Sequence, residues 1–174
     1  DTYEFYLGED PKTAINKMLV NFDRRFDDEM RAAAQEKGYS VRDIVIIASM
    51  IEKETDGTDQ AHIASVIYNR LTNTSAETVG LLGIDATLVY ALGRPITQDD
   101  YQTADTPYNT YKYQGLPPGP ISNPGMVAIR AAMNPDSTSD YYYVLGNDGK
   151  HHFFKTLKGQ QDFIAQQQAE KRSG

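Results

Sequence analysis

The densest apolar segment of the chain is residues 44–51 (IVIIASMI), and it sets the strongest limit on the fold. It is far shorter than the roughly 20 apolar residues that a membrane-spanning helix needs. On a helical wheel of about 100° per residue, one broad face holds Val41, Ile44, Val45, Ile47, Ala48 and Ile51. Ser40, with Asp43 three residues later, resembles a helix-opening capping box. The sequence therefore predicts a core helix over residues 41–54.

The remaining pattern mixes helices with a few short strands. Spacing, caps and breakers predict further helices over residues 11–36, 61–71, 86–92, 123–133 and 156–169, with Asp10, Asp59, Asp85 and Thr156 as N-terminal caps. Strands are expected over residues 3–7 and 108–113, and a hairpin over residues 141–155 around the turn Gly146-Asn147-Asp148-Gly149. Because no regular βαβ alternation exists, we expect an α+β fold. Its helical, bundle-like core would pack on a small antiparallel sheet in one catalytic domain.

Composition excludes several classes of function. The 174 residues carry 17 Lys+Arg and 24 Asp+Glu, a formal net charge of −7, which disfavours nucleic acid as a partner. Since there is no Cys, thiol nucleophiles, disulfides and Cys-ligated metals are excluded. The three His show no metal-ligand spacing, so we expect neither metal nor cofactor. Tyr outnumbers Phe by 12 to 6 and Trp is absent, which favours ring surfaces with a polar tip.

Glu52 falls on the apolar face of the helix predicted over residues 41–54. A carboxyl group there must be paired, protonated or beside a cavity, because burying a bare charge is costly. Burial and the negative end of the helix dipole would both favour the protonated form that a general acid needs. The alternative is structural, a salt bridge to Arg70, Lys53 or another cation. The downstream half is rich in Tyr, Asn, Thr and Pro, a composition typical of a polar cleft that binds sugars.

Several sequence blocks occur in an order known from one family. They are IEKET at 51–55, ASVIYNRL at 64–71, IDATLVY at 84–90, TPYNTY at 106–111, GLPPGPI at 115–121, NPG at 123–125, YYYV at 141–144 and HFF at 152–154. The chain resembles the endolytic murein transglycosylases, the YceG-like family, over most of its length. One departure is GLLGI at residues 80–84, where many relatives have a Met-x-Leu-Gln-Ser/Thr stretch, so contacts from this segment are expected to differ.

The resemblance implies an enzyme of the bacterial cell envelope, at the extracytoplasmic face of the cytoplasmic membrane. Its expected partners are peptidoglycan glycan strands and cell-wall synthases. Family members carry a membrane anchor and a LysM-like domain before the catalytic part. Residues 1–7 are therefore expected to be the remnant or seam of that LysM-like domain and residues 8–174 the catalytic domain. Membrane contact is expected only through an anchor outside this chain.

The family's catalytic Glu, taken as the first Glu of the Glu-Lys-Glu-Thr motif, corresponds to Glu52. The resemblance implies a reaction that cleaves the MurNAc–GlcNAc β-1,4 bond without water. In this reaction Glu52 protonates the departing oxygen and then accepts the proton of the sugar's C6 hydroxyl. The product ends in 1,6-anhydroMurNAc. The acetamido carbonyl of the substrate would stabilise the positive anomeric centre, a route outside the two-carboxylate scheme.

Further residues are expected to bind the substrate, each beside a structural alternative. They are Asp85, Asn69, Tyr108, Asn109, Tyr111, Pro118 and His152. The alternative for Asp85 is a helix N-cap, and the alternative for Tyr108, Asn109 and Tyr111 is a buried strand with satisfied polar tips. Pro118 lies in the segment 115–120, which is expected to form a rigid cleft wall. Arg70 is expected to pair with Glu52 or Asp85, or to complement its helix C-terminus. Glu54 is interpreted as a solvated or paired border residue.

Two rival functions remain open at this point. One is a two-carboxylate muramidase that uses Glu52 with Asp85 and incorporates water. The other is a non-catalytic glycan-binding module or synthase scaffold.

Overall fold

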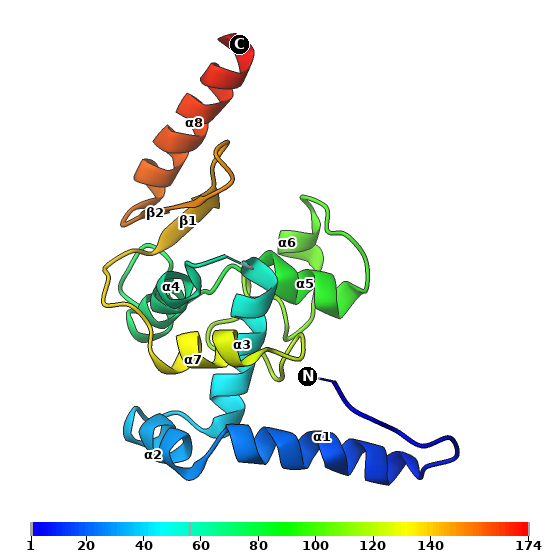
Figure 1. Ribbon diagram of the computed structural model, residues 1–174. Helices are drawn as coiled ribbons and strands as arrows, with labels where there is room; N and C mark the ends of the chain where they lie inside the picture. The colour runs from blue at the N-terminus through cyan, green and yellow to red at the C-terminus, as the bar shows by residue number, and fades with distance from the viewer. Residues whose placement is uncertain (1, 56, 174) are drawn as a thin grey trace. The chain divides into compact units, whose positions relative to one another are not determined.

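The computed structural model describes residues 2–55 and 57–173, which form two compact units, residues 1–41 and 42–174. The first unit holds helices α1 (Pro11–Arg25) and α2 (Asp28–Glu36). The second holds α3 to α8 and one two-stranded sheet, so the fold is α+β as expected (Figure 1). None of the helices in the described part of the chain has the length and apolarity needed to cross a membrane.

The first unit differs from the prediction in two ways. Residues 11–36 are not one helix, because Phe26 leaves the helical conformation at the end of α1. Asp27 then starts α2 as its N-cap, its side chain accepting the Met30 N–H at 2.9 Å. The strand expected over residues 3–7 is also absent, since those residues lie outside any helix or strand. The predicted cap of α1 is confirmed, because Asp10 accepts the Lys12 N–H at 2.9 Å.

Helix α3 (Val41–Glu54) is the centre of the second unit. Six consecutive residues, 46–51, are buried, so the middle of the helix is enclosed on all sides rather than along one stripe. Ser49 fixes the segment around residue 121 against it: its hydroxyl accepts the Ile121 N–H at 3.0 Å. Helices α4 (Gln60–Thr72) and α7 (Met126–Met133) pack against each other. Helix α7 begins later than the expected Asn123-Pro124 start, with Gly125 as its N-cap.

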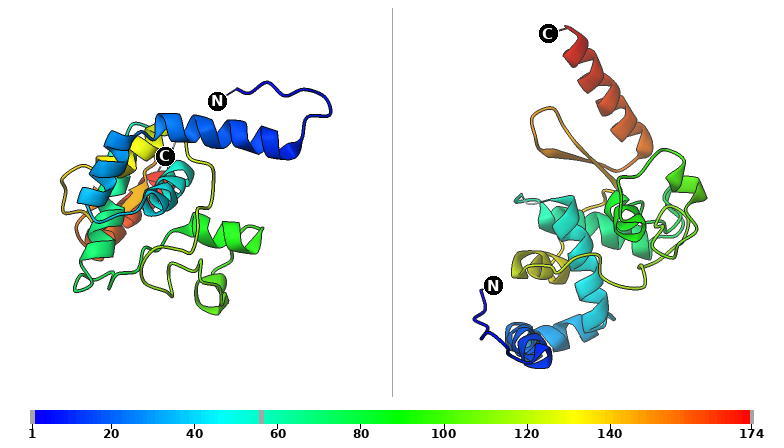
Figure 2. Two further views of the ribbon diagram at one scale, coloured as in Figure 1. Left: turned by 90° about the horizontal axis from the view of Figure 1, so that it is seen from below. Right: turned by 90° about the vertical axis from the view of Figure 1, so that its right-hand side faces the viewer.

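The predicted hairpin is confirmed. Strands β1 (Tyr142–Leu145) and β2 (His151–Phe154) pair antiparallel, with Tyr143 opposite Phe153. Helix α8 (Leu157–Ser173) follows, contacts both strands and runs on beyond them (Figure 2). Thr156 caps its start as expected, its hydroxyl accepting the Gly159 N–H at 3.2 Å.

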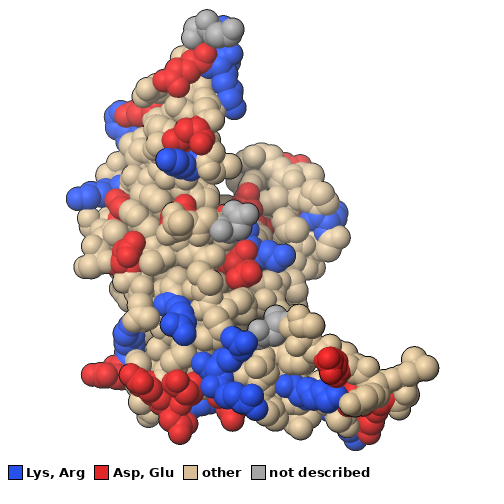
Figure 3. All heavy atoms as spheres, viewed as in Figure 1, with Lys and Arg blue, Asp and Glu red and all other residues tan. Residues whose placement is uncertain are grey.

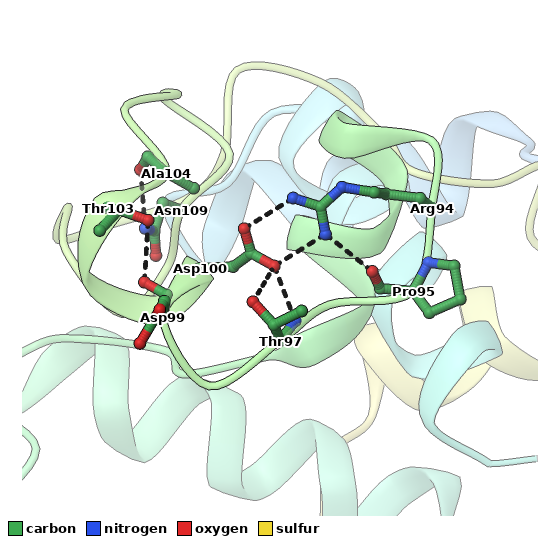
Figure 4. Close-up of polar contacts among 8 residues, drawn as sticks. All are labelled: Arg94, Pro95, Thr97, Asp99, Asp100, Thr103, Ala104 and Asn109. Carbon is green, nitrogen blue, oxygen red and sulfur yellow. Dashed lines mark hydrogen bonds and ion pairs between the residues drawn. The ribbon is translucent and has the colours of Figure 1, made fainter.

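The segment after α5 (Asp85–Leu92) is fixed by one charged staple. Gly93 ends α5 in the left-handed conformation with φ 64°, as the sequence predicts. The Arg94 guanidinium then donates two hydrogen bonds of 2.8 Å to the carboxylate of Asp100, the first residue of α6 (Asp100–Thr103) (Figure 4). The bonds from Arg94, followed by those from Thr97, hold the pKa of Asp100 well below its usual range. This staple closes the loop between α5 and α6.

Residues 108–113 form turns instead of the expected strand. Asn109 is fully buried, and its side-chain amide donates to the Ala104 carbonyl at 2.9 Å and the Tyr101 carbonyl at 3.2 Å. These bonds satisfy backbone groups that a sheet ladder would otherwise satisfy. The structural interpretation of Asn109, as a buried residue with satisfied polar groups, is therefore correct, although the element is a turn.

Candidate functional site

Two cavities meet at the C-terminal end of α3. The tyrosine cavity, of about 470 Å³, is lined by Glu54, Arg70, Glu77, Thr78, Val79, Leu81, Gly83, Asp85, Tyr111, Tyr142, Tyr143, Leu157 and Gln160. The histidine cavity, of about 520 Å³, is lined by Glu54, Thr55, Gly57, Thr58, Asp59, Leu145, Gly149, Lys150 and His151. Glu54 is the residue that both cavities share.

Acidic and basic side chains are interspersed over the visible face of the molecule (Figure 3).

Glu54 is the last residue of α3 and is half-buried. The Tyr143 hydroxyl donates to its Oε2 atom at 2.7 Å. Burial, helped by the nearby negative charge of Asp85, raises the pKa of Glu54, against the opposing hydrogen bond from Tyr143. The group is therefore a carboxylic acid that keeps its proton to higher pH than a surface Glu does.

Asp85 is the first residue of α5, and two tyrosines hold its carboxylate. The Tyr111 hydroxyl donates to Oδ1 at 2.5 Å and the Tyr101 hydroxyl to Oδ2 at 3.2 Å. The two rings meet edge to face, with centroids 4.6 Å apart. Burial and the bond to Asp85 raise the pKa of Tyr111 far above its usual range, so its phenol remains a donor. Asp85 is thus a fixed negative charge opposite Glu54 in the tyrosine cavity.

Arg70 forms another wall of this cavity. Its side chain is buried and donates to two carbonyls, that of Tyr141 at 2.6 Å and that of Leu82. Its guanidinium also lies 5.6 Å from the ring centroid of Tyr142 and 5.9 Å from that of Tyr143. Arg70 therefore ties α4 to the hairpin and to the segment before α5.

Gly83 has a backbone conformation in the cavity wall that favours glycine. Its φ is +57°, in the left-handed region that L side chains rarely adopt. A Cβ atom there would lie in ordinary van der Waals contact, 3.4 Å from the Tyr111 ring and 3.5 Å from the Arg70 guanidinium, so the preference for glycine is conformational. Its neighbours Leu82 and Ile84 are buried, so the segment 80–84 both anchors and lines the site.

Comparison with known proteins identifies the family. The model of the YceG-like family matches residues 1–166. The chain belongs to the YceG-like family. This confirms the resemblance that the sequence blocks indicate.

Relatives of this YceG-like chain include named enzymes. It is 36% identical over 163 residues to an endolytic murein transglycosylase of Bacillus subtilis, covering 90% of the chain and 43% of that protein. It is 31% identical over 151 residues to one of Streptococcus pneumoniae D39, covering 82% and 26%. A crystal structure of a YceG-like protein from Listeria monocytogenes superposes with a TM-score of 0.82 at 36% identity, covering 93% of this chain and 52% of that one. The chain thus spans less than half the length of these two curated relatives.

Glu52 of this YceG-like chain does not face the core, and that expectation is wrong. Its side chain is exposed, and its Oε2 atom accepts the Gly125 N–H at 3.1 Å. Because α3 is buried on all sides over residues 46–51, its apolar stripe does not indicate which way the last turn faces. Among the residues that the structure describes, no ion pair joins Arg70 to Glu52 or Asp85; Arg70 binds carbonyls instead.

Two of the predicted substrate-binding residues lie with Glu54 in the tyrosine cavity, namely Asp85 and Tyr111. Asp85 is not the N-cap that the sequence also allowed, since α5 begins at Asp85 itself and Ile84 is the N-cap residue. Asp59 does occupy the N-cap position of α4, but its side chain makes no capping bond and contacts His151 instead.

The other predicted substrate-binding residues do not line either cavity among the described residues. Asn69 donates to the carbonyls of Thr138 and Asp140, at 3.1 and 3.0 Å. Tyr108 packs against Tyr90, with ring centroids 5.1 Å apart.

Pro118 and His152 also lie outside the two cavities in the described lining. Pro118 is exposed, and its carbonyl accepts a bond from Arg42. His152 pairs with Asp148 at 3.1 Å and packs against Phe163, with ring centroids 4.4 Å apart. Its neighbour His151 lines the histidine cavity instead, because alternate residues of a strand face opposite sides.

Sequence reasoning missed Glu54, Tyr143 and His151 as site residues. A usable signal existed for two of them, because Glu54 and Tyr143 lie within the family blocks IEKET and YYYV. For His151 the adjacent His152 was chosen, and only the register of β2 separates the two.

Proposed function

We propose that this chain is the catalytic part of an endolytic murein transglycosylase that cleaves MurNAc–GlcNAc bonds and leaves 1,6-anhydroMurNAc ends. The observation that carries the proposal is Glu54, a half-buried carboxyl group with a raised pKa at the junction of two cavities. The names of the relatives support the same reaction class. Its substrate would be glycan strands of the cell envelope, outside the cytoplasmic membrane, with cell-wall synthases as partners.

The first step needs a proton at the glycosidic oxygen. Glu54, whose pKa burial raises, donates that proton from its protonated form as the bond from the anomeric carbon to the oxygen breaks. Positive charge then develops at the anomeric carbon. Asp85, a negative charge held in place by Tyr101 and Tyr111, stabilises it electrostatically.

The second step closes a ring instead of admitting water. The acetamido carbonyl of the substrate supports the anomeric centre, and the C6 hydroxyl then forms the new bond to it. Glu54, now a carboxylate, accepts the proton of that hydroxyl and returns to its starting form. One carboxyl group thus serves as acid and then base, so the reaction needs no second carboxylate as nucleophile.

The two cavities fit cleavage inside a strand. Because Glu54 lines both, sugars can lie on either side of the scissile bond. The tyrosine cavity offers ring faces and hydroxyls, the usual partners of sugar C–H surfaces and sugar hydroxyls. This arrangement supports the endolytic assignment over cleavage at a strand end.

The assignment of the acid favours Glu54 over Glu52. Glu52 is exposed and bound to the start of α7, whereas Glu54 is half-buried, lines both cavities and has a raised pKa. We therefore place the acid two residues later than the sequence pattern alone predicts.

Mass spectrometry of digested glycan strands tests the proposal. We expect anhydro ends, one water lighter than reducing ends, from the parent and none from Glu54→Gln. Reducing MurNAc ends would instead establish a hydrolase in which Asp85 assists Glu54. Strand binding without any cleavage by either protein, in a full-length protein containing this region, would establish a binding module.

A further inference from the structure

All three histidines are paired with an aspartate. The pairs are His62–Asp140 at 2.8 Å, His151–Asp59 at 2.8 Å and His152–Asp148 at 3.1 Å. In the described part of the chain, only the His151 pair lines a cavity with Glu54. His62 stacks on Phe153 instead, with ring centroids 3.6 Å apart. The His62 and His151 pairs are thus equally close but have different surroundings, so comparing them can distinguish a structural contact from a functional one.

The His151 ring is held in one orientation. The Thr55 hydroxyl donates to Asp59 Oδ1 at 2.7 Å, and Asp59 Oδ2 lies 2.8 Å from His151 Nδ1. A carboxylate at Nδ1 fixes the tautomer with its proton on that nitrogen. The ring then meets Tyr143 edge to face, with centroids 5.6 Å apart, and Tyr143 donates to Glu54. His151 therefore contacts Tyr143, the residue that is hydrogen-bonded to Glu54.

The proposed reaction makes a demand on this position. When Glu54 gives up its proton it leaves a carboxylate in a buried site, where Asp85 already carries a negative charge. The charges that oppose this are those of His151 and Arg70. Arg70 is bonded to two backbone carbonyls, whereas His151 lines a cavity together with Glu54. Facing His151 are Asp59, Tyr143, Glu54 and, on the cavity wall, Lys150.

We propose that His151, held by Asp59, is a positioning residue that supplies a positive charge to the Glu54 carboxylate. The inference rests on the proposed function and deepens it. The charge stabilises ionised Glu54 and so makes Glu54 a stronger acid. The strength of the acid is thereby tuned by a residue that does not touch the reacting atoms.

Two variants of His151 test this charge. His151→Gln removes the positive charge, so the pKa of Glu54 should rise by about half a pH unit or more. The basic limb of kcat/KM should move to higher pH by the same amount, with a lower maximal rate because Glu54 is then a weaker acid. His151→Lys restores a positive charge and should return the limb to the parental pH or below it. A purely structural role would not reproduce this opposite pair of shifts.

His62→Gln is the matched control, because it removes an equally close His–Asp pair that lines neither cavity. Glu54 is titrated by carboxyl ¹³C NMR without substrate, and folding is checked by circular dichroism. Identical Glu54 titrations in the parent, His151→Gln and His62→Gln would overturn the inference. A shifted titration in His151→Gln, in a protein that yields no anhydro ends, would support the charge coupling while overturning the proposed reaction.

Discussion

The two sides of the last turn of α3 have opposite environments. Glu52 lies at the surface and accepts one backbone N–H from Gly125, whereas Glu54 lies at two cavities and accepts the Tyr143 hydroxyl. Both occupy the same helix end, so the helix dipole acts on both and cannot explain the difference. What differs is the chain that surrounds them: the α7 start on one side, α5 and the hairpin on the other. Tertiary surroundings, more than position in the helix, distinguish the two carboxyl groups.

The largest expected difference between the two sides is catalytic. Glu54→Gln keeps the shape of the side chain but removes its proton, and should lower the rate of strand cleavage by about 10³-fold. Glu52→Gln should stay within about threefold of the parent, because the amide oxygen can still accept the Gly125 N–H. Rates come from release of anhydro-ended fragments. Inactive Glu52→Gln beside active Glu54→Gln would reverse the assignment in favour of the first Glu.

A smaller effect is expected at the partner of Glu54. Tyr143→Phe removes the hydroxyl that stabilises the ionised form, so the pKa of Glu54 should rise further. We expect about a tenfold loss of rate and a basic limb at higher pH. Tyr108→Phe, outside both cavities among the described lining residues, serves as the control. Equal pH profiles for the two variants would contradict the role of the Tyr143 bond.

Stability should distinguish the two sides as well. The pKa of Glu54 is raised in the folded state, so its stabilising effect is present below the unfolded-state value, about 4.5, and is lost as the pH rises through the folded-state value. Above that range, ionised Glu54 costs stability that a neutral amide does not. Glu54→Gln should therefore raise Tm by about 2–4 °C at pH 8 and leave it unchanged at pH 4. Calorimetry at both pH values gives the answer, and a Tm loss at pH 8 would count against a buried acid.

The smallest effect is expected from the exposed side. Glu52→Gln removes a negative charge from the start of α7, where helix-dipole interactions contribute about 0.3–1 kcal/mol. Tm should fall by about 1–3 °C at low salt, and the loss should shrink as salt screens the charge. Lys53→Gln, on the neighbouring exposed position, is the control for a simple change of net charge. A salt-independent loss would point to packing instead.

Local patterns predicted most of the fold. The helix at residues 41–54 and the hairpin around residues 146–149 follow from helical periodicity and turn chemistry, which depend on neighbours in sequence. Two predictions were wrong because side chains bond to backbone groups nearby in the chain. Asp27 interrupts what looked like one helix by capping a second, and the buried amide of Asn109 stabilises turns where alternation suggested a strand.

The candidate site was only partly predictable. The sequence blocks that mark the family include Asp85 and Tyr111, and these two residues do lie together. The choice between Glu52 and Glu54 could not be made from a helical wheel, because the cavities are built from residues 70–85, 111 and 142–151, far along the chain. The seven residues that α3 buries show only that the helix is central.

Gly83 gives the site an unusual kind of mutational sensitivity. It contributes no functional group, yet its φ of +57° is one that L side chains rarely adopt. Any other residue would therefore strain the backbone between Leu82, whose carbonyl accepts a bond from Arg70, and the Gly83 N–H, which donates to the Thr110 carbonyl at 3.0 Å. In a random library screened for activity, residue 83 should tolerate fewer replacements than Glu52. A residue without a side chain would then mark the site as clearly as its charged groups do.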